Sequence, residues 1–262
     1  MRKIDEKLIN RLTNGDLIPL LNYIESDNDL RLEVRQKGEA FVYYRKGKAL
    51  EIGGLKVDEK YGNVPSAKLA VSTPSEYFRL IKKSIDNWLE SEKKRAEFDT
   101  QQNIAQRNQD KEDRYIILDM EYAFEQNQIE KEKREKRAIF DLLGIERKTE
   151  TITFFEVKKG MGATKGKSGI GEHINDFKTY LFGENSKFFR TNLINDIKNI
   201  VEDKIKLGIL KDFDIPGNLE QHNPELIFIF HPNNDSQIAD FSKELRNRHK
   251  LIIVDINNYK LK

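Results

Sequence analysis

The chain has 262 residues, enough for one large domain or two small ones, and its 37% hydrophobic and 34% charged residues predict a core beneath a strongly ionic surface. It contains no cysteine, which excludes disulfides, cysteine nucleophiles and thiolate zinc sites. Its 46 basic and 44 acidic residues nearly balance, so a surface that binds nucleic acid would have to be a local basic patch. No apolar run is long enough for a membrane helix and the start of the chain lacks the apolar part of a signal peptide, so we expect a cytoplasmic protein without membrane contact.

Residues 1–70 are typical of a small α+β region. Helix-like spacing of leucine and isoleucine predicts helix over residues 1–28, and alternation predicts a strand over 31–35. Residues 41–52 favour a β-hairpin that turns at a lysine-glycine pair. Glycine and proline within 62–65 indicate a flexible connection. We expect this region to supply specificity for a substrate or a partner.

Residues 71–262 predict a second domain in which helices and strands follow one another. Pro74 suits a first helical turn, and the apolar stripe after it predicts one long helix, or two with a break near Ser91. Further strands are expected at 115–124, 137–145, 151–159, 226–230 and 251–255, and further helices at 172–181, 189–206 and 236–247. The predicted fold class is therefore α/β (α+β) with a mixed sheet, in the order α-βββ-α-α-β-α-β.

The strand at 151–159 carries two charges on one face. Side chains alternate along a strand, so Glu156 and Lys158 share a face with Phe154 and lie two strand rises, roughly 7 Å, apart. Charges on an apolar strand are costly unless they are paired or used. The pattern is open to two interpretations, an E-x-K metal site or an ordinary ion pair on an edge strand.

Hairpin geometry brings further acids to the same level. If the strands at 137–145 and 151–159 form a hairpin about the short turn at 146–150, Asp141 faces Glu156 or its neighbour. If the strands at 115–124 and 137–145 form a hairpin about 125–136, Glu121 lies near Asp141. Like charges placed opposite one another are destabilising, and a hard divalent ion such as Mg²⁺ relieves this by binding one or two carboxylates, water and phosphate oxygens. Asp119 shares a face with Glu121 and is a weaker additional candidate.

The chain has an Asp about fifteen residues before a Glu-x-Lys, on neighbouring strands of an αβββαβ order. In this it resembles the restriction-endonuclease-like PD-(D/E)XK nuclease superfamily over roughly residues 75–262. The resemblance implies that Asp141 and Glu156 bind Mg²⁺ (or Mn²⁺) and that Lys158 assists hydrolysis. It implies Glu121 as a further metal ligand, with His173 and Gln102 as weak candidates on flanking helices. The chain departs from the motif at Phe140, where the family often has Pro.

The segment after the E-x-K strand is rich in glycine and lysine. Lys159, Lys165 and Lys167 follow one another without an intervening acid, which favours contacts to nucleic-acid phosphates that do not read sequence. A P-loop interpretation fails on spacing, because the glycines before the Gly-Lys-Ser triplet stand at the wrong distances.

Two functions remain open from these residues. The first is a Mg²⁺-dependent nuclease that hydrolyses phosphodiester bonds in nucleic acid, with DNA as the expected substrate and a homodimer if both strands of a duplex are cut. By fold analogy alone it would act in defence, restriction or repair in a prokaryotic cytoplasm. The second is a catalytically inactive, nuclease-like module that binds nucleic acid or protein.

Overall fold

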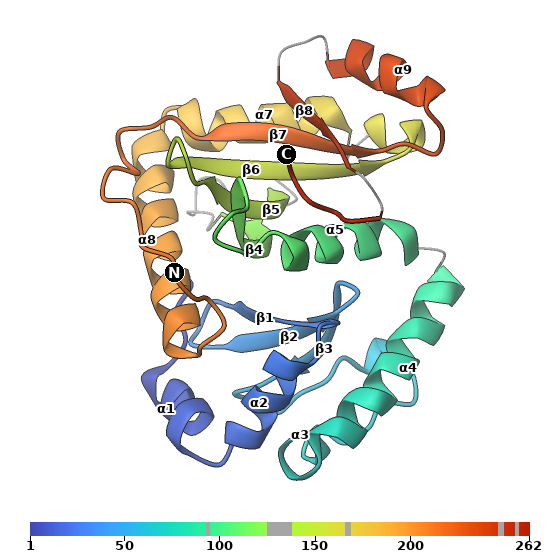
Figure 1. Cartoon of the computed structure of the whole chain (residues 1–262), viewed down its shortest axis with the longest axis vertical. Helices are drawn as coiled ribbons and strands as arrows, with labels where there is room; N and C mark the ends of the chain where they lie inside the picture. The colour runs from blue at the N-terminus through green and yellow to red at the C-terminus, as the bar shows by residue number, and fades with distance from the viewer. Residues whose placement is uncertain (93–94, 125–137, 166–168, 246–248, 255–256) are drawn as a thin grey trace. The chain divides into compact units, whose positions relative to one another are not determined.

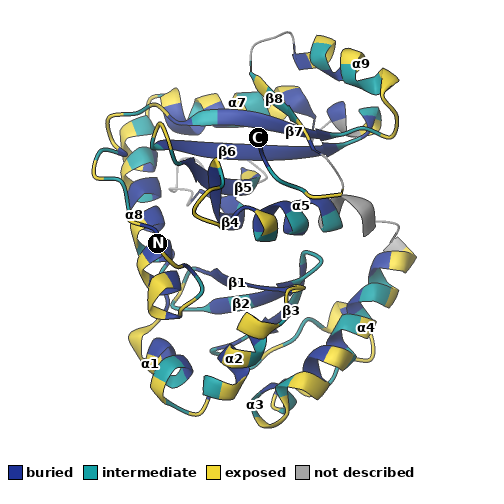
Figure 2. Ribbon diagram, in the orientation of Figure 1, coloured by how far each residue is buried: buried dark blue, intermediate teal, exposed yellow. Residues whose placement is uncertain are grey.

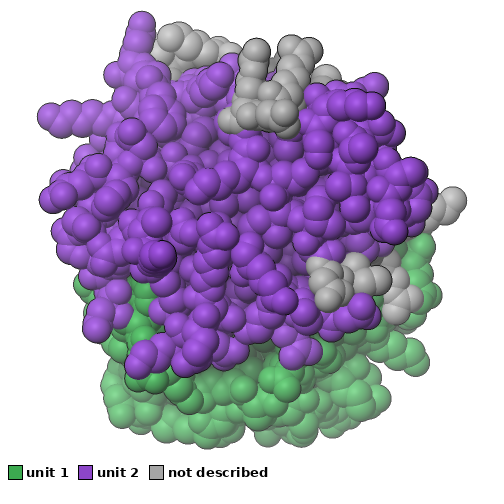
Figure 3. All heavy atoms as spheres, turned by 45° about the horizontal axis from the view of Figure 1, so that its top comes forward, with its two compact units in different colours: residues 1–102, 198–213 green, residues 103–197, 214–262 purple. Residues whose placement is uncertain are grey.

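The computed structural model describes residues 1–92, 95–124, 138–165, 169–245, 249–254 and 257–262. The chain forms two compact units, coloured separately in Figure 3: unit 1 comprises 1–102 and 198–213, and unit 2 comprises 103–197 and 214–262. The division falls within helix α5 (Arg95–Arg107) and helix α8 (Ser186–Lys206). No helix in the described part of the chain is long and apolar enough to cross a membrane.

Unit 1 is built on a three-stranded antiparallel sheet in the order β1-β2-β3 (Figure 1). Its elements are α1 (Glu6–Asn14), α2 (Ile18–Ser26), β1 (Leu30–Val34), β2 (Ala40–Tyr44), β3 (Gly47–Glu51), the 3-10 helix η1 (Glu59–Tyr61), α3 (Leu69–Ser72) and α4 (Pro74–Glu92). The predicted hairpin is confirmed, and Arg45 and Lys46 form its turn with positive φ of 49° and 61°, as a tight hairpin turn requires. The single helix predicted over 1–28 is two helices, because α1 ends before Gly15.

Unit 1 extends past the boundary predicted at residue 70, because helix α4 packs within it. Tyr77 donates its hydroxyl hydrogen to the carbonyl of Ala49 on β3 at 2.6 Å. Phe78 stacks on Tyr23 of α2 with ring centroids 5.4 Å apart. The apolar stripe read from the sequence as the start of the second domain therefore belongs to the core of the first unit.

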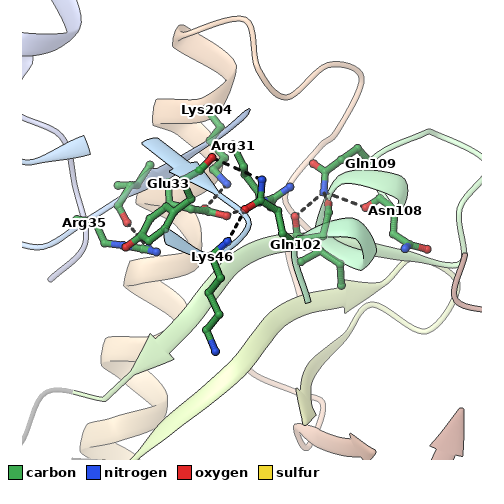
Figure 4. A network of polar contacts seen from close by, with 12 residues as sticks. Arg31, Glu33, Arg35, Lys46, Gln102, Asn108, Gln109 and Lys204 are labelled. Carbon is green, nitrogen blue, oxygen red and sulfur yellow. Dashed lines mark hydrogen bonds and ion pairs between the residues drawn. The ribbon is translucent and has the colours of Figure 1, made fainter. Parts of the chain in front are cut away.

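A charged cluster lies inside unit 1, and Figure 4 shows it around Glu33. Glu33 on β1 is fully buried and accepts hydrogen bonds from Lys204 Nζ at 2.6 Å and from Arg31 Nε. Burial alone would raise the pKa of Glu33, but the positive charges of Arg31 and Lys204 outweigh it and lower the pKa to about 2. Lys204 belongs to α8, so residues far apart in the sequence complete this core.

Unit 2 contains a five-stranded mixed sheet in the order β4-β5-β6-β7-β8. Its strands are β4 (Tyr115–Ala123), β5 (Ile139–Glu146), β6 (Thr151–Lys159), β7 (Glu225–His231) and β8 (Lys250–Ile253), and its other elements include η2 (Met161–Thr164), α7 (Ile170–Phe182) and α9 (Ser236–Leu245). β4, β5 and β6 are antiparallel neighbours, whereas β6, β7 and β8 run parallel. The strands and helices predicted downstream of residue 115 are confirmed over the described residues, and residues 137, 246–247 and 255 of the predicted ranges lie outside them. Figure 2 shows β6 and β7 as buried strands.

An aromatic cluster joins α7 to one face of this sheet. The ring of Phe154 on β6 lies 4.8 Å from that of Phe140 on β5 and 5.9 Å from that of Phe177 on α7. Helix α7 therefore covers the face that carries Phe154 and, by strand alternation, Glu156 and Lys158.

Candidate active site

The ladder between β5 and β6 sets the position of the central acid. Leu142 pairs with Phe155 and Leu143 with Phe154, so Asp141 stands opposite Glu156, which confirms the predicted hairpin register. At this level Asp141 Oδ2 accepts the backbone N–H of Val157 at 2.9 Å. The Asp141 carboxylate thus bonds β6 where the backbone pairing of β5 and β6 ends, and this hydrogen bond holds Asp141 against β6.

Glu156 is the centre of a buried cluster of charges. Its side chain is only 1% exposed, and β6 is an interior strand, so the ion pair that Glu156 forms with Lys158 is present but does not lie on an edge strand. Lys158 Nζ, itself 5% exposed, donates to Glu156 Oε2 at 3.4 Å. On the other side, His173 Nδ1 of α7 lies 3.1 Å from Glu156 Oε1.

The environment perturbs the pKa of two members of this cluster. Burial, helped by the negative charge of Asp141 and opposed by His173 and Lys158, raises the pKa of Glu156 to about 7. Burial lowers the pKa of His173, but its interaction with the Glu156 carboxylate, 3.1 Å away, outweighs burial and leaves that pKa raised. A buried acid that titrates near neutral pH beside a second acid and a lysine is the kind of group that functional sites contain.

The acids of β4 follow a less regular strand. Met120 pairs with Leu142 and Tyr122 with Phe140, so Glu121 is at the level of Asp141, as predicted. Glu121 adopts a positive φ of 55°, however, and Asp119 is fully buried after a register shift in the same strand. Within the residues that the structure describes, no three His, Asp or Glu side chains are grouped to hold a metal ion. Glu121 therefore does not complete a three-ligand set with Asp141 and Glu156.

The glycine-rich segment begins directly after β6. Lys159 stands opposite His231 in the parallel β6–β7 ladder, and burial followed by the charge of Lys159 lowers the pKa of His231. Lys165 is largely exposed, at 78% of its side chain, and lies 3.7 Å from Glu244 of α9. Lys167, the third predicted phosphate contact, lies outside the described residues. Sequence reasoning missed His231, because no pattern in the sequence specifies which residue pairs across a parallel ladder.

The two weak candidates on helices have different outcomes. His173 contacts Glu156 as described above. Phe177 faces the sheet from α7, and His173 precedes it by four residues, so the helix period places both side chains on the same face. Gln102 has a structural role in unit 1: its Oε1 accepts the N–H of Lys46 at 2.7 Å and its Nε2 donates to the carbonyl of Asp29 at 2.6 Å (Figure 4).

Comparison with known proteins does not assign the chain to a family. No family model, curated protein or solved structure matches it.

Proposed function

We propose that this protein is a divalent-metal-dependent nuclease with a restriction-endonuclease-like core, in which Asp141, Glu156 and Lys158 form the catalytic site. The observation that carries the proposal is the fully buried Glu156, whose pKa is raised to about 7, beside Asp141, Lys158 and His173. A core built only for stability does better with apolar residues than with a buried acid and a buried lysine flanked by a half-buried acid and histidine. The buried Glu33 of unit 1 is neutralised by its cationic partners and has a lowered pKa, whereas Glu156 keeps a raised pKa, which is typical of functional sites.

The donor set fits Mg²⁺ or Mn²⁺ with two protein carboxylates. Mg²⁺ commonly binds one or two carboxylates and takes water and substrate phosphate oxygens for its other positions, so Asp141 and Glu156 suffice without Glu121. A bound ion would lower the pKa of a water molecule and neutralise charge on the phosphodiester.

The remaining side chains supply charge and position. Lys158 brings a buried positive charge toward the phosphate oxygens, where negative charge increases in the transition state. His173 holds Glu156 Oε1 and favours its ionised form, which is the form that binds a cation. Lys159, the last residue of β6, and the exposed Lys165 would contact neighbouring phosphates without reading sequence.

The direct test is metal-dependent cleavage by single variants. We expect Glu156→Ala and Lys158→Ala each to lower cleavage of plasmid and single-stranded DNA in Mg²⁺ or Mn²⁺ by at least about a hundredfold, the scale of losing one group that stabilises a transition state. Lys250→Ala is the matched control, because Lys250 forms an exposed pair with Glu225 on the same sheet. Cleavage at the parental rate by both site variants would refute the assignment.

A second candidate function is a nuclease-like module that binds nucleic acid or protein without cutting. It is favoured by the contacts of Glu156 to both Lys158 and His173, and by the lack of a three-ligand group in the described ranges. This module would bind DNA equally well with Mg²⁺ and with EDTA, and would leave every substrate of an RNA and DNA panel intact.

A further inference from the structure

A pocket of about 350 Å³ opens in unit 2 beside the candidate active site. It is lined by Thr164 of η2, by Ile170, Ile174 and Lys178 of α7, and by Glu244 and Leu245 of α9. Three of its lining residues are aliphatic, and a threonine, a glycine, one acid and one base complete the walls.

Helix α7 contributes residues both to the pocket and to the acid cluster. Ile170, Ile174 and Lys178 recur every four residues and share one face of the helix. His173 precedes Ile174 by one residue, which is a rise of about 1.5 Å and a turn of about 100°. A ligand that reaches Glu156 and His173 is thus within one helix width of the pocket.

We propose that this pocket takes one unstacked nucleobase, so that the preferred substrate is single-stranded nucleic acid. The inference rests on the proposed function and names its substrate class. Flat apolar ring faces suit the walls formed by Ile170, Ile174 and Leu245. A base that is stacked and paired in a duplex would have to leave the helix to enter.

The charged side chains of the pocket favour a particular kind of base. A glutamate carboxylate accepts hydrogen bonds from an exocyclic amino group, as on cytosine. Glu244 therefore favours amino-bearing bases over thymine or uracil, and Lys178 can donate to a ring carbonyl.

Lys165 places a positive charge at the rim of the pocket. Its Nζ lies 3.7 Å from Glu244 Oε1, and both side chains are well exposed. An exposed pair of this kind contributes little to stability, so a phosphate can replace the carboxylate as the partner of Lys165. The base inside and the phosphate at the rim would then belong to the same nucleotide.

The test measures binding of fluorescent ten-nucleotide dC and dT single strands, and of the corresponding duplexes, by anisotropy in EDTA, where a metal-dependent site cannot cut. Ile174→Trp fills the pocket and should weaken dC binding about tenfold, the scale of one base contact. Ile205→Trp, at an exposed position of α8, is its control. Glu244→Ala should remove the preference for dC over dT, whereas Asp240→Ala on the same helix should keep it.

Two results would overturn the inference: parental dC binding and base preference in Glu244→Ala, or duplex binding as tight as single-strand binding. Because Glu244 is a partly exposed side chain, this arm decides the question even if Ile174→Trp does not fold. A Mg²⁺ cleavage assay on the same preparations separates the two proposals. If Ile174→Trp loses dC binding but the parent cleaves nothing, the nuclease proposal is refuted and the pocket proposal is supported. If the parent cleaves DNA but shows no base preference, the nuclease proposal is supported and the pocket proposal is refuted.

Discussion

Glu156 holds its proton more tightly in the folded protein than in the unfolded chain. Its pKa rises from 4.5 to about 7 on folding, chiefly because of burial. A raised folded pKa contributes stability below the unfolded value, and that contribution is lost as the pH rises through 7. Binding of a cation would recover part of it, because the cation stabilises the ionised carboxylate.

Glu156→Gln should therefore become more stable than the parent at alkaline pH. We expect the free energy of unfolding of the variant, relative to the parent, to increase by up to about 3 kcal/mol between pH 5 and pH 8. Urea titrations at the two pH values measure it. Adding Mg²⁺ at pH 8 should raise the stability of the parent and leave the variant unchanged. A difference between the two proteins that does not vary with pH would contradict the buried, protonated acid.

His173 lowers the pKa of Glu156, so its removal should be visible in the pH dependence of cleavage. In His173→Ala the pKa of Glu156 should rise further, because burial and Asp141 then act with only Lys158 opposing them. If ionised Glu156 is required, the acidic limb of the pH–rate profile moves to higher pH while the rate at high pH changes little. A uniform loss of rate at every pH would instead indicate a structural role for His173.

At the scale of elements, the end of β6 depends on a glycine. Gly160 has a φ of 64°, and a Cβ there would collide with the side-chain amide of Asn233, which follows β7. The ψ of 172° at Gly160 makes this a conformation that is essentially restricted to glycine, so Gly160→Ala should destabilise the protein by about 1–3 kcal/mol plus the cost of the collision. Thermal melts of the double variant with Asn233→Gly should recover only the second part. Full recovery would show that φ at this position is not constrained.

The two hairpins of unit 2 show what a sequence can specify. The turn between β5 and β6 is short, so its length determines the register and places Asp141 opposite Glu156. The connection between β4 and β5 is long, and β4 contains a register shift and a residue with positive φ. Alternation alone therefore predicts the level of Glu121, whereas the direction of its side chain depends on backbone irregularities that leave no pattern in the sequence.

At the scale of the whole molecule, the domain boundary predicted at residue 70 differs from the two units that the chain forms. Composition changes near residue 70, but the core of unit 1 also takes α4 and residues 198–213. The reason is visible at Glu33, whose partner Lys204 lies 171 residues later in the chain. Contacts over such separations are set by packing, which local periodicity does not report.

Glu33→Gln tests how much this distant pair stabilises unit 1. Removing the carboxylate leaves Arg31 and Lys204 without their buried acid, and we expect a loss of about 3 kcal/mol at pH 7. Because folding lowers the pKa of Glu33 from 4.5 to about 2, the extra stability of the parent over the variant is fully present above pH 4.5 and is lost as the pH falls toward 2. Chemical unfolding from pH 7 to pH 2 measures the difference. An advantage that persists at pH 2 would show that packing, not charge, is responsible.

The separation of Glu33 from Lys204 also concerns how the protein is made. A ribosome that adds 5–20 residues per second needs roughly ten to thirty seconds to synthesise the intervening 171 residues. During that time the emerging N-terminal segment carries an acid whose lysine has not yet been translated. Unit 1 should therefore finish folding only after α8 has left the exit tunnel, and until then it is a natural client for a chaperone.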